Sequence, residues 1–146
     1  MLQRYVLDAS VVVKWYFAEV WSDEARQLLT QYEEGRADFC APDLLAAELA
    51  NVFWKRQRRG ELSEEQAEKF LASFMNLRIL WYESRSLAGE ALRLSMAVGC
   101  TAYDAIYIAL VRQLEVFLIT ADETLRNTLQ DRPEGSLIVT LSELSA

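Results

Sequence analysis

The chain has 146 residues and contains no histidine, an absence that narrows the chemistry open to it. Without histidine the protein has no Ser-His-Asp or Cys-His catalytic arrangement and no histidine proton shuttle, and almost every type of zinc site is excluded. Any chemistry that the chain performs must therefore be carried by its carboxylates.

Cysteine and long apolar runs are also scarce. The two cysteines, Cys40 and Cys100, lie in apolar surroundings, so we expect small buried apolar residues in a reducing cytosol rather than a disulfide framework. No apolar run reaches about 18 residues, so no membrane span is expected. The start of the chain, "MLQRYVLDAS", lacks the basic segment, apolar stretch and cleavage site of a signal peptide. These features predict a cytoplasmic protein.

The net charge of −7 argues against tight nonspecific binding to long nucleic acid by charge alone. Twelve of the fifteen basic residues are arginine, which suits bidentate contacts to carboxylate or phosphate. With 52% hydrophobic residues, the chain is long enough to bury a sizeable core. We expect one domain that covers residues 1–146.

Short apolar segments alternate with helical patterns along the chain. The segments typical of strands are residues 4–10, 37–42, 78–82, 116–120 and 136–140. Helices are predicted over residues 22–34, 43–60, 64–77, 85–98 and 102–113, and another begins near Asp122. Their ends carry standard signals, namely Gly35, Gly60 and Gly99 after helices, and capping boxes at Ser63–Gln66 and Thr101–Asp104.

This alternation predicts an α/β fold, a three-layer α/β/α sandwich on a mostly parallel five-stranded sheet. Ligands of such sheets bind outside the carboxyl ends of the strands, near a switch in strand order. The first predicted strand delivers Asp8, with Ser10 two residues later, and the fourth delivers Thr120 and then Asp122. We therefore expect two acids, each with a nearby hydroxyl group, at one edge of the sheet.

Two further acids lie on the apolar faces of predicted helices. Glu48 comes three residues after Leu45 and four before Val52, so it shares their helical stripe. Asp104 comes four residues before Ile108, again on the inward face. Both helices are thus expected to turn an acid toward the protein interior.

Each acid also has a purely structural interpretation. Asp8 and Asp122 could cap the helices that follow, Asp104 could complete a capping box, and Glu48 could be a partly exposed residue beside the stripe. Four converging carboxylates, however, would repel one another and raise their pKa values unless a cation neutralised them. Their hard oxygen atoms suit Mg²⁺ or Mn²⁺, which can activate a water for an in-line phosphoryl displacement.

Four segments, in order, resemble the motif blocks of PIN-domain proteins, and more narrowly those of VapC-type toxins of toxin–antitoxin pairs. They are "YVLDASVVVKW", "PDLLAAELANVFWK", "TAYDAIYIALV" and "LITADETL", and the resemblance runs from Tyr5 to about Leu141. It implies an α/β/α sandwich on a parallel sheet and an Mg²⁺- or Mn²⁺-dependent endoribonuclease that has an antitoxin as its partner.

The family's acidic quartet maps onto Asp8, Glu48, Asp104 and Asp122, which the resemblance marks as catalytic and metal-binding residues. Ser10 matches the family's small hydroxyl residue after the first acid, and Thr120 takes the hydroxyl position before the last. None of these positions departs from the family pattern. Glu123 is an additional acid without an assigned role.

Alternative functions stay open at this point. A haloacid-dehalogenase-like phosphatase would need a second aspartate where Ser10 stands. A phosphoacceptor receiver domain would need paired acids near the first strand and a lysine after the fifth, and "SLIVTLSEL" contains none. A non-catalytic PIN-like binding module is the remaining class.

The densest basic patch lies at the end of the helix predicted over residues 43–60. It holds Lys55, Arg56, Arg58 and Arg59, which either contact an RNA backbone or pair with the carboxyl end of their own helix. Lys14, after the first acidic block, is a further candidate phosphate contact or a solvated side chain.

Aromatic residues gather on the same helix and on the next one. Phe53 with Trp54, and Phe70 with Phe74, either pack in the core or form an exposed apolar surface on the helix pair. In the resembled family such surfaces serve homodimer contacts and antitoxin binding. We therefore expect a homodimer that also binds an apolar segment of a partner.

Overall fold

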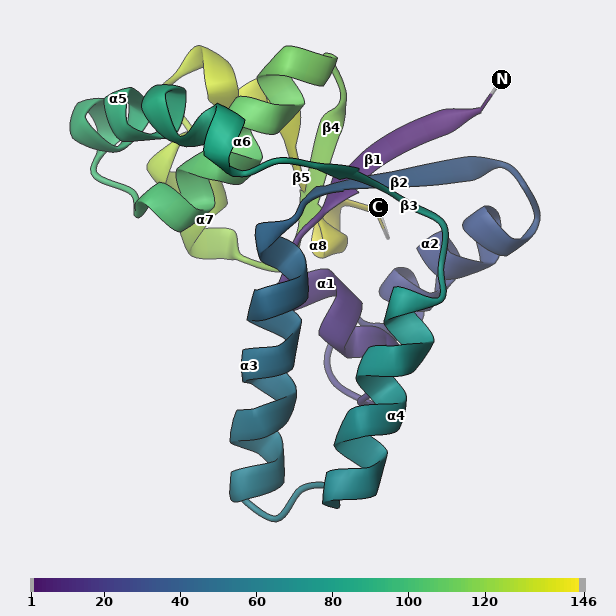
Figure 1. The fold of residues 1–146 in the computed structure, drawn as a ribbon. Helices are drawn as coiled ribbons and strands as arrows, with labels where there is room; N and C mark the ends of the chain where they lie inside the picture. The colour runs from purple at the N-terminus through teal and green to yellow at the C-terminus, as the bar shows by residue number, and fades with distance from the viewer. Residues whose placement is uncertain (1, 145–146) are drawn as a thin grey trace.

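A computed structural model of the protein describes residues 2–144 and places five strands in one sheet (Figure 1). The spatial order is β3-β2-β1-β4-β5, and each neighbouring pair is parallel. The strands are β1 (Gln3–Leu7), β2 (Ala37–Pro42), β3 (Ile79–Tyr82), β4 (Phe117–Thr120) and β5 (Ile138–Thr140). The sequence pattern predicted these five strands, and the sheet is wholly rather than mostly parallel.

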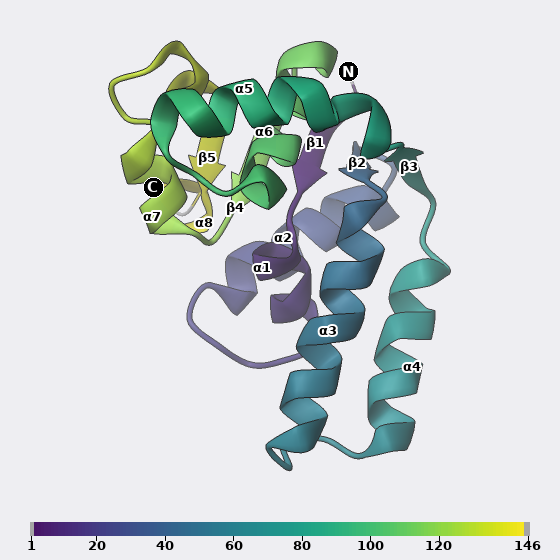
Figure 2. The ribbon, with the colours of Figure 1, turned by 60° about the vertical axis from the view of Figure 1, so that its left-hand side comes forward.

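Helices cover both faces of the sheet, as the two ribbon views show (Figures 1 and 2). From β1 the chain moves outward to β2 and β3, and it then returns past β1 to β4 and β5. Because crossovers between parallel strands are right-handed, outward connections in opposite directions place their helices on opposite faces. The order of the strands therefore reverses between β1 and β4, where a ligand site is expected.

Six of the helices match the segments that the sequence predicts. They are α2 (Ser22–Glu33), α3 (Leu44–Arg58), α4 (Glu64–Met75), α5 (Ala88–Val98), α6 (Ala102–Leu114) and α7 (Glu123–Thr128). The sequence pattern missed several one-turn elements, which are too short to show a helical period. They are α1 (Ala9–Val12), η1 (Val13–Trp15), η3 (Pro133–Leu137) and α8 (Leu141–Leu144), whereas η2 (Arg85–Leu87) forms the start of the helix predicted over residues 85–98.

The capping box predicted at Ser63–Gln66 is complete, whereas at Thr101–Asp104 the structure gives only the bond to the Thr101 side chain. Ser63 and Gln66 form both hydrogen bonds of a capping box, at 2.8 and 3.1 Å. The Thr101 hydroxyl group caps α6 by accepting the Asp104 backbone N–H at 3.2 Å. Gly99 ends α5 with φ +83°, a left-handed conformation that glycine adopts without steric cost.

The core lies on both sides of the central strands. Val6 and Leu7 of β1 are buried beside Leu118 and Ile119 of β4. Helix α6 packs against these strands and is buried along most of its length. Cys40 is buried in this core, as the sequence predicts, whereas Cys100 is only partly buried.

No single helix within the described residues is long and apolar enough to cross a membrane. The segments Arg85–Val98 and Ala102–Leu114 reach that composition only as a pair, which bends by 113°.

The helices α3 and α4 form a pair that extends away from the sheet (Figures 1 and 2). Their aromatic side chains mostly point inward: Phe53 and Phe74 are buried, and the Phe53 and Phe70 rings pack with centroids 5.9 Å apart. Trp54 alone among these four is half exposed, at 50%. Of the two alternatives, packing in the core holds for Phe53 and Phe74, and only Trp54 is exposed, because Phe53 packs on Phe70 and Phe74 packs on Trp15 and Trp81.

Candidate active site

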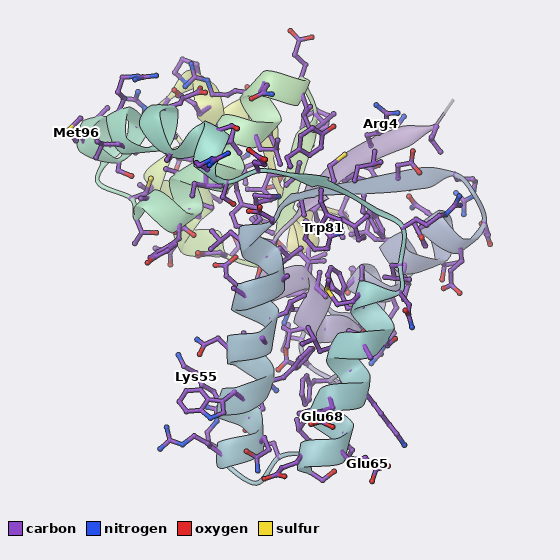
Figure 3. All side chains as sticks on the ribbon, in the orientation of Figure 1. Arg4, Lys55, Glu65, Glu68, Trp81 and Met96 are labelled. Carbon is purple, nitrogen blue, oxygen red and sulfur yellow. The ribbon has the colours of Figure 1, made fainter. Side chains whose placement is uncertain are left out.

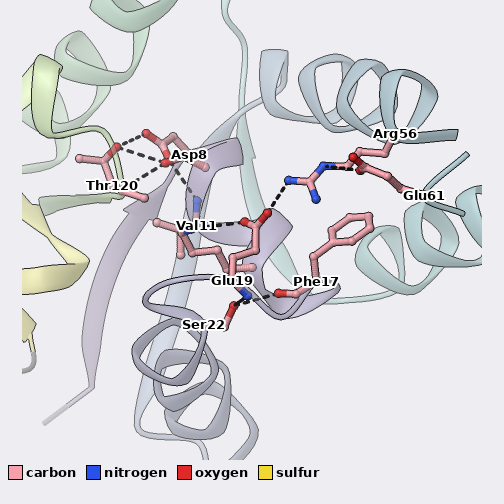
Figure 4. Close-up of polar contacts among 11 residues, drawn as sticks. Asp8, Val11, Phe17, Glu19, Ser22, Arg56, Glu61 and Thr120 are labelled. Atoms are coloured by element: carbon pink, nitrogen blue, oxygen red, sulfur yellow. Dashed lines mark hydrogen bonds and ion pairs between the residues drawn. The ribbon is translucent and has the colours of Figure 1, made fainter. Parts of the chain in front are cut away.

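Asp8 lies where β1 ends, beside the end of the neighbouring strand β4. The strand register pairs Leu7 with Ile119, so the next position along places Asp8 opposite Thr120. The Thr120 hydroxyl group donates to Asp8 Oδ2 at 2.5 Å, and the Ser10 hydroxyl group donates to Oδ1 at 2.5 Å (Figure 4). Two hydroxyl groups from two strand ends thus hold one carboxylate.

These hydroxyl groups are themselves held by the backbone that follows β4. Ser10 Oγ accepts the Ala121 N–H at 2.9 Å, and Thr120 Oγ1 accepts the Asp122 N–H at 3.0 Å. Because both oxygen atoms already accept a hydrogen bond, their protons are free to point at Asp8. The arrangement gives Ser10 and Thr120 the supporting place that the sequence predicts for them.

Asp8 and Asp122 also cap helices, so this structural interpretation holds as well. Asp8 is the N-cap of α1 and accepts the Val11 N–H at 3.3 Å. Asp122 is the N-cap of α7 and accepts the Leu125 N–H at 3.0 Å. Capping fixes the direction of each side chain at the edge of the sheet, and it leaves carboxylate oxygen atoms for other contacts.

Glu48 and Asp104 reach the same region from helices on opposite faces of the sheet. Both are partly buried, as expected for acids on the apolar stripes of α3 and α6. Glu48 Oε1 accepts a hydrogen bond of 2.5 Å from the hydroxyl group of Tyr107, a residue of α6 that is only 2% exposed. This contact joins the two helices at the acids.

The four acids form a connected set of like charges. Glu48 interacts with Asp8 and Asp104, Asp8 interacts with Asp104, and Asp104 interacts with Asp122. Four elements that are far apart in the sequence thus bring their acids to one edge of the sheet, and we call this set the acid cluster.

The surroundings of the acid cluster make its carboxylates harder to ionise. Burial raises the pKa of Asp8 from 3.8 to about 6, and the charge of Asp104 adds to the rise. The hydrogen bonds from Ser10, Thr120 and Val11 oppose that rise without cancelling it. Burial and neighbouring acids also raise the pKa values of Glu48 and Asp104.

The acid cluster has no cationic partner among the described residues. Within residues 2–144, none of the four acids forms an ion pair. Nor do any three His, Cys, Asp or Glu side chains of that range stand where they could hold a metal ion together. The cluster therefore fits a hard divalent cation by charge and by donor type, whereas its side chains do not form a finished coordination site.

Two of the predicted basic contacts are engaged elsewhere. Lys14 and Arg56 both pair with Glu19, at 3.3 and 2.6 Å, and the Arg56 guanidinium lies 4.2 Å from the centre of the Phe17 ring (Figure 4). The side chains of the two cations are only 13% and 19% exposed. We call Lys14, Glu19 and Arg56 the Glu19 cluster.

The other predicted contacts gather near the far end of α3. Lys55, Arg58 and Arg59 line a hollow of about 390 Å³, and Lys55 points outward from the helix (Figure 3). With a rise of about 1.5 Å per residue, Lys55 lies roughly 10 Å along the helix from Glu48. These three cations thus stand apart from the acid cluster on the helix that supplies one of its acids.

Sequence reasoning missed Tyr107 and Glu19. Tyr107 carries a usable signal, because a tyrosine in an apolar helical run brings a hydroxyl group that needs a partner when buried. Glu19 carries no such signal, since its partners come from a one-turn element and from α3.

Comparisons with known proteins find relatives of the chain and of its fold. Residues 5–128 match the family model described as PIN domain. The protein named Ribonuclease VapC3 from Pyrobaculum aerophilum is 33% identical over 126 residues, which cover 84% of this chain and 92% of that protein. A crystal structure from Pyrobaculum aerophilum shares the fold with a TM-score of 0.68 and 21% identity, covering 99% of this chain and 97% of the other. A toxin-antitoxin complex from Klebsiella pneumoniae contains a chain with a TM-score of 0.60 and 16% identity, and the match covers 94% and 97% of the two chains.

Proposed function

Because the chain belongs to the PIN domain family, we propose that it is a ribonuclease that hydrolyses phosphodiester bonds of RNA. The observation that carries this proposal is the acid cluster: four carboxylates from separate elements meet at the edge of the sheet, and none of them pairs with a cation of residues 2–144. Such an arrangement costs stability, so it is expected where a ligand supplies the missing charge.

The acids Asp8, Glu48, Asp104 and Asp122 would hold Mg²⁺ or Mn²⁺. When bound, such an ion supplies positive charge and Lewis acidity for the displacement at phosphorus. Ser10 and Thr120 orient Asp8 through their hydroxyl protons, and the caps of α1 and α7 direct Asp8 and Asp122 toward the strand edge.

RNA would reach this edge along α3. Lys55, Arg58 and Arg59 carry charge that can hold phosphates and offset the repulsion between RNA and the acids. Lys14 and Arg56 would have to leave Glu19 before they contact phosphate, and Arg59 would have to leave Glu61, so Lys55 and Arg58 are the contacts with most support.

The biological setting that best fits the family is a toxin–antitoxin pair. A solved toxin-antitoxin complex contains a chain of this fold, and this supports an antitoxin as the protein partner. A homodimer is part of the same proposal. The half-exposed Trp54, beside an apolar hollow of about 330 Å³ between α3 and α4, offers a place for a partner segment.

The test is RNA cleavage by wild-type protein and by the Asp104→Asn and Asp8→Asn variants, with added Mn²⁺ and with chelator. Each substitution keeps the size of the side chain and removes one charge from the acid cluster, so we expect cleavage to fall by at least about 100-fold. Asp23→Asn is the matched control, because it makes the same substitution at an acid of α2 whose side chain is 90% exposed and lies outside the acid cluster.

Capping alone predicts a different result. Asparagine is also a good N-cap, so under that interpretation the Asp8→Asn variant would cleave as fast as the control. Cleavage that persists in chelator, or that proceeds at the wild-type rate in Asp104→Asn, would contradict the proposed function.

A further inference from the structure

Tyr107 is a buried tyrosine whose hydroxyl group makes its one hydrogen bond, within the described residues, to the acid cluster. It lies on α6, is 2% exposed, and donates to Glu48 Oε1 on α3 at 2.5 Å. Its phenol oxygen is also close enough to interact electrostatically with Asp8 and Asp104. The residue therefore touches the cluster without being one of its acids.

The position of Tyr107 on α6 explains how one helix serves two acids. Tyr107 follows Asp104 by three residues, and side chains at that spacing lie on the same face of a helix. The helix thus turns an acid and a hydroxyl group toward the same point. Because Tyr107 is buried in the core, its ring gives the hydroxyl group a fixed location.

Glu48 needs such a fixed contact because its side chain can also turn away from the acid cluster. A hollow of about 290 Å³ lies beside it, lined by Leu44, Ala47, Asn51 and Tyr103. A glutamate side chain has several rotamers and loses much conformational freedom when it is held in one place. Without a hydrogen bond at the cluster, the charged carboxylate would gain by turning to water in this hollow and away from the other acids.

We propose that Tyr107 is a positioning residue that holds Glu48 at the acid cluster by occupying Oε1, which leaves Oε2 as the oxygen for a divalent cation. Among the described residues, no hydrogen bond is formed by Oε2. The proposal rests on the proposed function, since it assigns the ion to the same site. Carboxylates that bind metals are commonly oriented by hydrogen bonds from neighbouring groups in this way.

The experiment measures the dissociation constant for Mn²⁺ by calorimetry on the full chain, with thermal melts in chelator to confirm folding. Tyr107→Phe removes one oxygen atom and keeps the ring. Tyr16→Phe is the matched control, because its hydroxyl group bonds to Ser73 at 3.4 Å, away from the acids. We expect Tyr107→Phe to weaken Mn²⁺ binding about 10- to 100-fold and the control to leave it unchanged.

A second pair of variants separates positioning from a general effect on the fold. In the Glu48→Gln background the carboxylate that Tyr107 positions is already gone, so adding Tyr107→Phe should weaken Mn²⁺ binding by less than about twofold. Equal weakening in both backgrounds, or unchanged Mn²⁺ binding in Tyr107→Phe, would overturn the role of Tyr107. A wild-type protein that cleaves RNA without any divalent ion would instead overturn the proposed function.

Discussion

Asp8 and Glu19 are both partly buried acids near the start of the chain, yet their surroundings shift their pKa values in opposite directions (Figure 4). Burial raises the pKa of each carboxyl group. At Glu19 the nearby Arg56 and Lys14 outweigh burial, so the pKa is lowered overall. Asp8, by contrast, forms no ion pair with a cation of residues 2–144, and the charge of Asp104 raises its pKa further.

The difference shows what each region contributes. The Glu19 cluster pairs its one acid with two cations and joins η1 and the loop before α2 to α3, so loss of the acid is expected to destabilise the fold. The acid cluster leaves its charge unbalanced, and the repulsion between its carboxylates weakens the metal-free protein. Such a local loss of stability is expected at a site where a ligand binds.

The first prediction would break this contrast by removing the unbalanced charge. A pKa that rises from 3.8 to about 6 on folding corresponds to about 3 kcal/mol lost when Asp8 ionises in the metal-free protein. Between these two pKa values the folded state binds more protons than the unfolded state, so wild-type stability falls as pH rises from about 4 to about 6. Asp8→Asn cannot ionise, and its free energy of unfolding should stay flatter over that range.

Urea unfolding in chelator at pH 4 and pH 7 measures this effect. The variant should gain up to about 3 kcal/mol over wild type at pH 7, and most of the gain should vanish at pH 4. The same pH shift should leave the difference between Asp23→Asn and wild type nearly constant. A variant that is less stable than wild type at pH 7 would show that capping by Asp8 outweighs its buried charge.

The second prediction removes the balanced acid. Glu19→Gln leaves the mostly buried Lys14 without its counter-charge and leaves Arg56 with only Glu61, at 3.5 Å, so we expect a loss of about 2 kcal/mol in the free energy of unfolding at pH 7. Cleavage per folded molecule should not change. Because the pKa of Glu19 is lowered on folding, its contribution is lost as pH falls through that value, and the gap between variant and wild type should narrow in acid.

Glu65→Gln is the matched control for this substitution. Glu65 pairs with Lys69 at 3.1 Å on the exposed face of α4, where such a pair contributes at most about 0.5 kcal/mol. If both glutamine variants lose the same small amount, the Glu19 cluster does not stabilise the fold in the way its burial indicates.

The third prediction has the smallest expected effect and concerns the cations that are proposed to bind RNA. Lys55 and Arg58 form no ion pair within the described part of the chain, in contrast to Lys14 and Arg56. The Lys55→Gln/Arg58→Gln double variant should bind single-stranded RNA roughly three- to tenfold more weakly. The slope of log affinity against log salt concentration should drop by about 0.7 for each lost phosphate contact.

Fluorescence anisotropy with a labelled RNA in chelator, which prevents cleavage under the proposed function, measures this binding. Lys69→Gln/Arg26→Gln removes the same charge from exposed positions on other helices and should leave the salt slope unchanged. An equal drop for both double variants would mean that net charge, rather than the end of α3, attracts RNA.

Local signals in the amino-acid sequence predict much of the fold. The apolar segments at 37–42 and 116–120 and the stops at Gly60 and Gly99 mark strands and helices because these signals depend on neighbours in the chain. The positions of the acids at strand ends and on helix stripes are predictable for the same reason. That Asp8, Glu48, Asp104 and Asp122 act together in catalysis stays a prediction.

The sequence by itself thus determined which elements form and which of them carry acids. Only the tertiary structure decided that β1 lies beside β4, that Tyr107 bonds to Glu48, and that Glu19 takes Lys14 and Arg56 away from the proposed RNA contacts. The physical reason is range. Helix and strand periods repeat within a few residues, whereas the pairing of β1 with β4 and the contacts of Tyr107 with Glu48 and of Arg56 with Glu19 join residues that are distant in the chain and meet only when the sheet and its crossovers have formed.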